Sequence, residues 1–183
     1  FAENMHQEID VLFLCVGHGD AKKFLTENPV DARIKIIDLS QDFRLNANKK
    51  STNREFVYGL PELNYHSIQT AQNIANPGCF ATAIQLGLLP LAKAGLLTEV
   101  HTTGITGSTG AGQSLSATSH FSWRANNISA YKTLQHQHLN EIGESLQQAS
   151  GNQIDCSDLI HFVPWRGDFT RGIYISSVVK CSL

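Results

Sequence analysis

The stretch IDVLFLCVGHGDAKKFLTENPVDARIKIIDLS, residues 9–40, decides the fold. Its first part, residues 9–16, is a continuous apolar run of strand-forming residues, and the DAKKFLTEN segment after it is typical of a short helix. A second apolar run follows at residues 34–40. A strand, a helix and a strand at this spacing predict a parallel α/β unit, whose ligands bind at the carboxyl ends of the strands. Polar residues lie directly after both runs.

The pattern changes further along the chain. Residues 41–70 are polar and rich in turn formers, so we expect a loop with short elements, including YGLPEL. Residues 80–94 predict an apolar helix that Gly95 ends. The remaining predicted elements are a strand at residues 98–106, a helix at 134–148, and two final strands in LIHFVPW and GIYISSVVKCS. The architecture therefore changes near residue 78, from parallel α/β to a mixed, mainly antiparallel α+β region.

Composition limits the kind of partner. The chain has 183 residues, of which 42% are hydrophobic and 16% charged, so it can bury one large core or two small ones. A net charge of −2 gives no basic field for nucleic acid or anionic lipid. No apolar run approaches the roughly 20 residues that cross a bilayer. Four cysteines without CxxC pairing favour a reducing compartment. We expect a cytoplasmic protein that binds small molecules or other chains.

One cysteine stands at the start of a predicted helix. In ANPGCFATAIQLGLLPLAKAG, residues 75–95, Cys79 follows a Pro-Gly turn. Free N–H groups and the positive end of the helix dipole favour a thiolate there, which is the form that acts as a nucleophile. A small buried hydrophobe is the commoner fate of a free cysteine, and we expect it for Cys15 and Cys181 in strand patterns. For Cys79, the position at a helix start favours a role as a nucleophile.

The segment HQHLNE offers an acid–base group. On a helix, His138 and Glu141 are neighbours at i and i+3, so the carboxylate can fix the tautomer of the imidazole. His136 would lie about 200° around the helix from His138. The alternative is an exposed polar helix face. A zinc site is disfavoured because no second cysteine or histidine stands at ligand spacing, so we expect no metal.

Glycines and arginines supply further candidates. In GITGSTGAGQS, residues 104–114, small side chains let backbone N–H groups approach a phosphate, an amide or an oxyanion; a flexible surface loop is the alternative. Arg44 and Arg171 can each clamp a carboxylate or phosphate. Ordinary surface arginines are far more frequent than clamps, so these two depend on their surroundings.

Six motifs in order resemble one enzyme family. NPGCFATAIQLGLLPL, preceded by DLSQDFRL and YGLPELN and followed by GSTGAG, HQHLNEI and VP…RGI, is similar to the N-acetyl-gamma-glutamyl-phosphate reductases, NADPH-dependent enzymes of arginine biosynthesis. The resemblance covers about residues 9–175. It implies a partial Rossmann-type unit over 1–78, without its first strand and glycine-rich turn. An α+β catalytic and dimerisation domain of the glyceraldehyde-3-phosphate-dehydrogenase-like type would follow over 79–183, truncated at its C-terminal end.

The resemblance also implies roles for individual residues. Cys79 matches the family nucleophile, with the predicted catalytic residues His138, Glu141 and His136 near it. The residues predicted to bind cofactor are Gly17, His18, Gly19, Thr109, Gly110, Ala111 and Gly112. The residues predicted to bind substrate are Ser40, Arg44, Asn76 and Arg171, with Arg166 as a rival to Arg171. Gln113 stands where the family usually has an arginine.

The implied reaction is reduction of an N-acyl-gamma-glutamyl phosphate through a thioester on Cys79, with NADP as cofactor and a homo-oligomer as the assembly. The residues do not distinguish an acetyl from another acyl group. Two alternatives remain open: an enzyme similar to aspartate-semialdehyde dehydrogenase, and a substrate-domain module without activity of its own.

Overall fold

The computed structural model describes residues 9–51, 53–112, 114–156 and 158–182. The chain divides into two compact units, Phe1–Gly78 and Cys79–Leu183, which are described separately. Within the described ranges, none of the helices is both long enough and apolar enough to cross a membrane.

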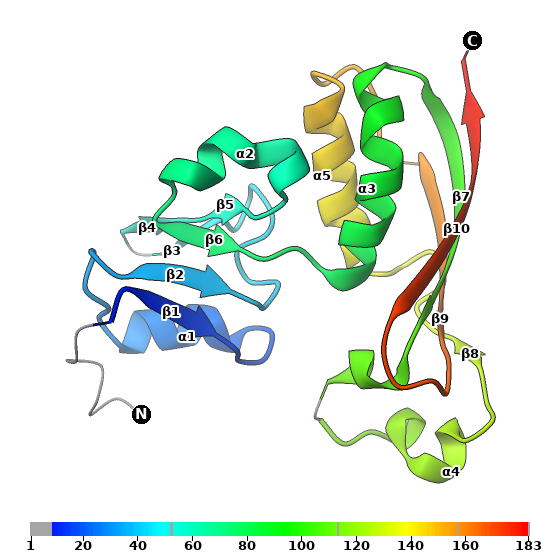
Figure 1. The fold of residues 1–183 in the computed structure, drawn as a ribbon, viewed down its shortest axis with the longest axis horizontal. Coiled ribbons are helices and arrows are strands. Elements are labelled where there is room, and N and C mark those ends of the chain that lie inside the picture. The colour runs from blue at the N-terminus through cyan, green and yellow to red at the C-terminus, as the bar shows by residue number, and fades with distance from the viewer. Residues whose placement is uncertain (1–8, 52, 113, 157, 183) are drawn as a thin grey trace. The chain divides into compact units, whose positions relative to one another are not determined.

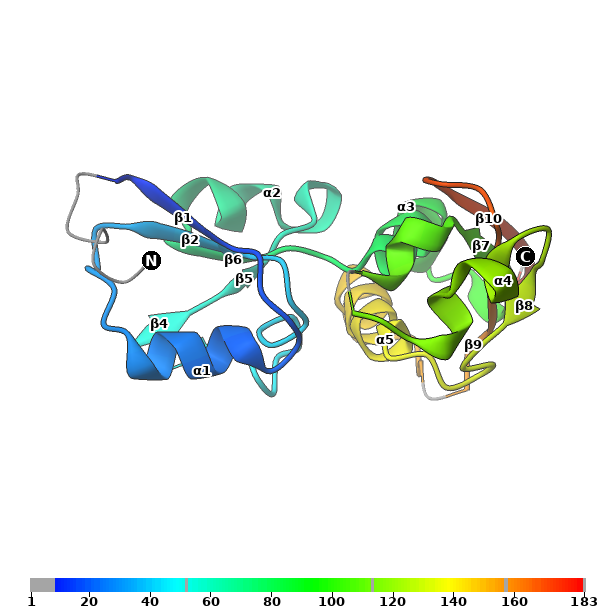
Figure 2. The same ribbon diagram turned by 90° about the horizontal axis from the view of Figure 1, so that it is seen from below.

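The first unit is built on a parallel four-stranded sheet. The order is β1-β2-β6-β5, with all neighbours parallel (Figure 1). Its strands are β1 (Val11–Leu14), β2 (Lys35–Asp38), β5 (Val57–Tyr58) and β6 (Asn73–Ala75). Helices α1 (Asp20–Glu27) and α2 (Pro61–Thr70) lie on opposite sides of this sheet (Figures 1 and 2). The predicted parallel α/β unit is confirmed.

A small apolar core holds this unit together. Helix α1 buries Ala21 and Leu25 toward the sheet, beside Ile36 of β2. Phe43 and Phe56 stack with ring centroids 4.1 Å apart. Phe56 directly follows β4 (Arg54–Glu55), which pairs with β3 (Lys50–Ser51) in a two-stranded sheet.

Helix α2 corrects the expectation of a loop with short elements over residues 41–70. None of its residues is buried, so its sequence lacks the apolar periodicity that signals a helix. A proline in the first turn, Pro61, starts it where a missing N–H costs nothing.

The second unit begins with the long apolar helix α3 (Cys79–Lys93). It ends as predicted at Gly95, whose φ of 69° is left-handed. The Leu96 N–H then donates to the Leu91 carbonyl at 3.1 Å, which closes the last turn. The Pro-Gly turn before Cys79 is therefore followed directly by fifteen residues of helix.

A mixed four-stranded sheet forms the other layer of this unit. Its order is β10-β7-β9-β8; β7 pairs antiparallel with β10 and parallel with β9. Its strands are β7 (Leu97–Thr106), β8 (Ser129–Ala130), β9 (Ile160–Arg166) and β10 (Ile173–Cys181). Helices α3 and α5 (His138–Ala149) cover one face of it (Figure 1). The strands expected at 98–106 and in the last third are confirmed.

Helix α5 begins four residues later than the sequence predicts. Lys132 and Leu134 have φ values of 46° and 59°, which a right-handed helix does not allow. The Leu134 N–H instead donates to the Phe162 carbonyl of β9 at 2.9 Å, so this segment runs along the sheet edge. His136 consequently precedes the helix.

Candidate functional site

Cys79 is the first residue of α3 and its side chain is exposed, whereas Pro77 and Gly78 before it are buried. The predicted placement of this thiol at a helix start is confirmed. Cys15 is also exposed, which corrects the expectation of a buried residue: it lies just beyond the end of β1 at Leu14.

Phe80 anchors the first turn of α3 to the sheet. It is 1% exposed and stacks edge-to-face on Phe162 of β9, at 5.1 Å between centroids. A Cβ at Gly104 of β7 would lie 2.6 Å from the Phe80 ring, so only glycine leaves room for it. The same ring contacts His136 at 5.8 Å and His138 at 6.4 Å. Phe80 thus joins the helix start that carries Cys79 to both histidines.

His136 is buried in this aromatic cluster, and its Nδ1 accepts the backbone N–H of His138 at 3.2 Å. Its ring lies 4.5 Å from the His138 ring, which corrects the expected separation around a helix, because His136 stands before α5. Burial, with the charges of Lys132 and Arg166, lowers the pKa of His136 to about 4. His136 is therefore neutral at pH 7.

His138 and Glu141 face one another across one turn of α5, as the i, i+3 spacing predicts. The His138 Nε2 lies 3.6 Å from the Glu141 Oε1, and both side chains are at least nine-tenths buried. Gln85 of α3 donates its side-chain N–H to the Glu141 carbonyl at 3.3 Å, which holds this turn against α3. A carboxylate beside Nε2 favours a proton on that nitrogen.

Tyr131 and Arg166 complete this group, and sequence reasoning missed Tyr131. The Arg166 guanidinium carbon lies 4.7 Å from the centre of the Tyr131 ring. Burial raises the pKa of Tyr131, Arg166 opposes this, and Cys79 adds to it, so Tyr131 is within electrostatic range of both residues. A single tyrosine in a polar loop carries no sequence signal of such a role. Arg166, the predicted rival of Arg171, is partly buried, and its charge acts on both Tyr131 and His136.

The structure also brings the glycine loop and Arg171 together. The Thr109 hydroxyl donates to the Thr170 carbonyl at 2.6 Å, and the Gly107 N–H donates to the Gly172 carbonyl at 2.9 Å. A Cβ at Gly107 would lie 2.8 Å from the Arg171 backbone nitrogen. Gly110, Gly112 and Arg171 are exposed in this arrangement.

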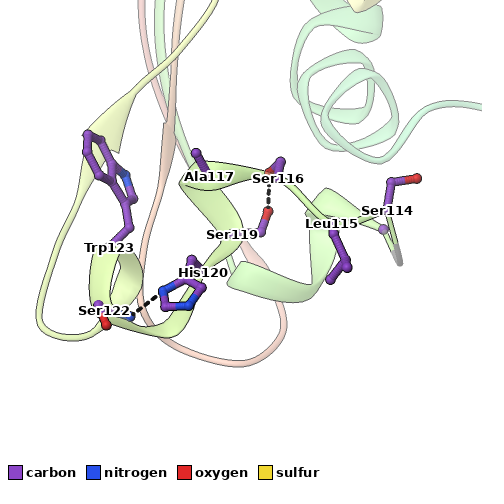
Figure 3. Close-up of a pocket in the computed structure, with 9 residues that line it drawn as sticks. Ser114, Leu115, Ser116, Ala117, Ser119, His120, Ser122 and Trp123 are labelled. Carbon is purple, nitrogen blue, oxygen red and sulfur yellow. Dashed lines mark hydrogen bonds between the residues drawn. The ribbon is translucent and has the colours of Figure 1, made fainter.

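A surface hollow of about 840 Å³ follows the glycine loop (Figure 3). Gly112, Leu115, His120 and Trp123 are among the residues that line it. The His120 Nδ1 accepts the Ser122 N–H at 3.2 Å, and Ser116 and Ser119 share a hydrogen bond of 2.8 Å. These polar groups thus bond within the wall of the hollow.

In the first unit, the predicted residues gather at the carboxyl end of the sheet. Ser40 is buried: its hydroxyl donates to Asp38 at 2.8 Å, and its Oγ accepts the Asp42 N–H at 3.1 Å. Burial raises the pKa of Asp38, and its bonds to Ser40 oppose this. The Ser40 hydroxyl therefore serves the turn, and its role in substrate binding stays a prediction.

Arg44 is likewise engaged within the unit. Its Nε donates to the Asn76 carbonyl at 2.8 Å and its guanidinium to the Leu39 carbonyl at 3.1 Å, which ties together the segments after β2 and β6. Asn76 is exposed, directly before the Pro-Gly turn.

The predicted Gly17-His18-Gly19 turn is exposed after β1. The Asp42 carboxylate accepts the N–H groups of Gly19 at 2.6 Å and Lys22 at 3.1 Å. The N-terminus of α1 thus already holds a negative charge.

A unit with a parallel sheet is followed in the sequence by a unit with a mixed sheet, and the second unit begins with a cysteine at a helix start. This combination defines a class of protein. A family model described as "Semialdehyde dehydrogenase, dimerisation domain" matches residues 79–182, and "Semialdehyde dehydrogenase, NAD binding domain" matches residues 1–71. The chain belongs to the semialdehyde dehydrogenase family.

Several curated relatives share one name. N-acetyl-gamma-glutamyl-phosphate reductase of Christiangramia forsetii is 55% identical over 183 residues, 100% of this chain and 55% of the relative. The protein of that name from Flavobacterium johnsoniae is 54% identical over 99% of this chain and 55% of its own length. The resemblance inferred from the motifs is confirmed. The chain spans about 55% of the length of these relatives.

Solved structures confirm the fold class. Aspartate semialdehyde dehydrogenase from Francisella tularensis matches with a TM-score of 0.67 at 14% identity, over 100% of this chain and 62% of that one. Aspartate semialdehyde dehydrogenase II from Vibrio cholerae matches with a TM-score of 0.65 at 16% identity, over 94% and 56% of the two chains.

Proposed function

We propose that this protein reduces N-acyl-gamma-glutamyl phosphate to the corresponding semialdehyde with NADPH, in arginine biosynthesis. The observation that carries the proposal is the exposed Cys79 at the start of α3, joined through Phe80 to the buried pair of His138 and Glu141. The name that the close relatives share supports the choice of substrate.

The chain's own residues account for the acyl transfer. The Cys79 sulfur bonds to the acyl carbon of the substrate while the carbon–oxygen bond to phosphate breaks, which leaves a thioester and free phosphate. Backbone N–H groups at the start of α3 stabilise the oxyanion, at about 3 kcal/mol per donor in other enzymes. His138 moves a proton between the substrate oxygen and solvent, while Glu141 fixes its tautomer. His136, being neutral and buried, positions His138.

The residues of the Gly17–Gly19 turn fit an uncharged part of NADP. Gly19 has a φ of 91° and open space where a Cβ would be, so a ligand can approach its backbone closely. The Asp42 carboxylate at the N-terminus of α1 would repel a phosphate there and leaves the amide and ribose as partners. The second proposed contact with NADP is the glycine loop, at Thr109, Gly110, Ala111 and Gly112. When bound, NADPH supplies the hydride that reduces the thioester to an aldehyde.

The phosphate or carboxylate group of the substrate needs a positively charged side chain to bind it. Arg171 is exposed beside the glycine loop, and Arg166 lies over Tyr131 in the group around Cys79. We assign Arg171 to the substrate as predicted and retain Arg166 as its rival. Asn76, which is exposed and stands three residues before Cys79 in the sequence, is retained as a further predicted substrate contact.

The assembly we propose is a homo-oligomer, in keeping with the description of the family model for residues 79–182. A cytoplasmic location agrees with four free cysteines.

A second candidate, reduction of aspartyl phosphate, is favoured by the fold shared with aspartate semialdehyde dehydrogenases. One assay separates the two: NADPH oxidation with N-acetyl-gamma-glutamyl phosphate, with N-succinyl-gamma-glutamyl phosphate and with aspartyl phosphate, each repeated with NADH. Turnover of a glutamyl phosphate with NADPH supports the proposal. Turnover of aspartyl phosphate alone rejects it, and no turnover of any substrate favours a module without activity of its own.

A further inference from the structure

Three side chains of one sheet face converge outside the proposed active site. Glu99 and His101 are two residues apart on β7, so they project to the same side of the sheet. His161 of β9 is the direct cross-strand partner of His101. One ligand atom from each of the three lies within 4.8 Å of the other two. None of the three takes part in the proposed reaction.

The three side chains already contact one another. The His101 Nε2 lies 2.9 Å from the Glu99 Oε1, and the two imidazole rings stack at 4.7 Å with 24° between their planes. Donors around a tetrahedral zinc ion lie about 3.3 Å apart, given bonds near 2.0–2.1 Å. The three side chains are intermediate or exposed, so they have room to rotate toward that arrangement. The register of β7 and β9 holds His101 and His161 side by side.

The donor set selects a chemical class of ligand. Two imidazoles and one carboxylate suit a borderline first-row cation, whereas Ca²⁺ and Mg²⁺ prefer oxygen alone. We propose that Glu99, His101 and His161 bind a divalent cation of the zinc type, which would link β7 to β9. This cluster is distinct from the His136–His138 pair near Cys79.

A nearby lysine side chain weakens metal binding at this cluster. Lys180 of β10 pairs in register with Glu99, and Val178 pairs with His101. Of these two neighbours only Lys180 is charged, so its ammonium competes with a bound cation for the carboxylate. Replacing it by an uncharged side chain of similar length therefore tightens metal binding, whereas it would do nothing for a cation held elsewhere.

The test is a metal titration of the whole protein after chelation, with all four cysteines alkylated so that thiolates do not compete. Zn²⁺ binding is followed by calorimetry and Co²⁺ binding by its visible absorption. We expect one equivalent, about tenfold or more weaker in His101→Ala and in His161→Ala. His66→Ala, an exposed histidine on α2, is the matched control and should bind like the unaltered protein. Lys180→Met should bind more tightly.

Molar mass is measured for every variant, so that altered self-association is not taken for a lost ligand. Far-ultraviolet circular dichroism checks that each variant folds. Absence of stoichiometric binding, an affinity in the two histidine variants equal to that of the unaltered protein, or binding unaffected by Lys180→Met would each overturn the proposal.

Discussion

His136 takes the role that serine or aspartate has at the start of most helices, because its Nδ1 accepts the first N–H of α5. An acceptor at Nδ1 places the ring proton on Nε2, and burial against Phe80 and Phe162 keeps the ring uncharged. The His136 side chain therefore does two things: it accepts the first N–H of α5, and it gives His138 an uncharged neighbour.

The depressed pKa of His136 predicts acid-sensitive folding. Between pH 6.5 and about 4 the unfolded chain protonates this histidine and the folded chain does not, so the unfolded state binds more protons. The stability is complete above pH 6.5 and is lost as the pH falls toward 4, by about 3 kcal/mol in total. Denaturant unfolding at a series of pH values measures it.

His136→Gln keeps an acceptor but does not titrate, so it should remove this part of the pH dependence. The matched control is His120→Gln, because exposed His120 accepts the Ser122 N–H at the start of α4 (Phe121–Arg124). A pH dependence equal in both variants would contradict the assignment.

His138→Gln should lower kcat for the acyl phosphate by about 10²- to 10⁴-fold, which is the usual contribution of general acid–base catalysis. KM should change little, since the proposed role is proton transfer. Glu141→Gln should cost less, because it alters only the tautomer. A change confined to KM would instead indicate a binding role for His138.

At the scale of elements, α3 and β7 meet where Gly104 leaves space for Phe80. Gly104→Ala would place a Cβ 2.6 Å from the Phe80 ring and 2.8 Å from the Ile175 side chain. We expect a loss of about 1–3 kcal/mol of unfolding free energy and slower alkylation of Cys79, because the first turn of α3 must shift.

Gly87→Ala is the control on the same helix, since beyond its chain neighbours and the helix's own nearby backbone no atom lies within 4 Å of its Cβ position. It should stabilise the protein by up to about 1 kcal/mol and leave Cys79 alkylation unchanged. Thermal unfolding and peptide-resolved alkylation measure both variants. Equal effects of the two substitutions would show that Gly104 is not needed for close packing.

The elements that sequence predicts are those with an apolar pattern. The strand of residues 98–106 and the end of α3 at Gly95 follow from such patterns and from a left-handed glycine. Helix α2 has no buried face, so it left no pattern. The start of α5 depends on left-handed Lys132 and Leu134, neither of which belongs to a residue type that favours that conformation.

Site residues were likewise predictable only where a local sequence feature marks them. Cys79 and the His138–Glu141 pair were predictable because a helix start and an i, i+3 spacing are local features. Tyr131 was not, because its position near Cys79 depends on tertiary packing around β9.

For the whole molecule, the central prediction besides activity is self-association. Among the described helices of the second unit, α3 and α5 lie on one face of the β10-β7-β9 sheet and none covers the other (Figure 1). Tyr174 and Val178 of β10 are 60% and 72% exposed. Light scattering should give at least twice the mass of one chain. Val178→Glu should shift the protein toward monomer, because a second copy would bury this side chain; a monomer before substitution would refute the proposed assembly.

Incubation with N-acetyl-gamma-glutamyl phosphate in the absence of NADPH tests the account most directly. Intact mass and peptide mapping should find one N-acetylglutamyl group on Cys79, released by hydroxylamine as a thioester is, and none in Cys79→Ala. An acyl group on another residue, or NADPH-dependent turnover that survives in Cys79→Ala, would show that Cys79 is not the nucleophile.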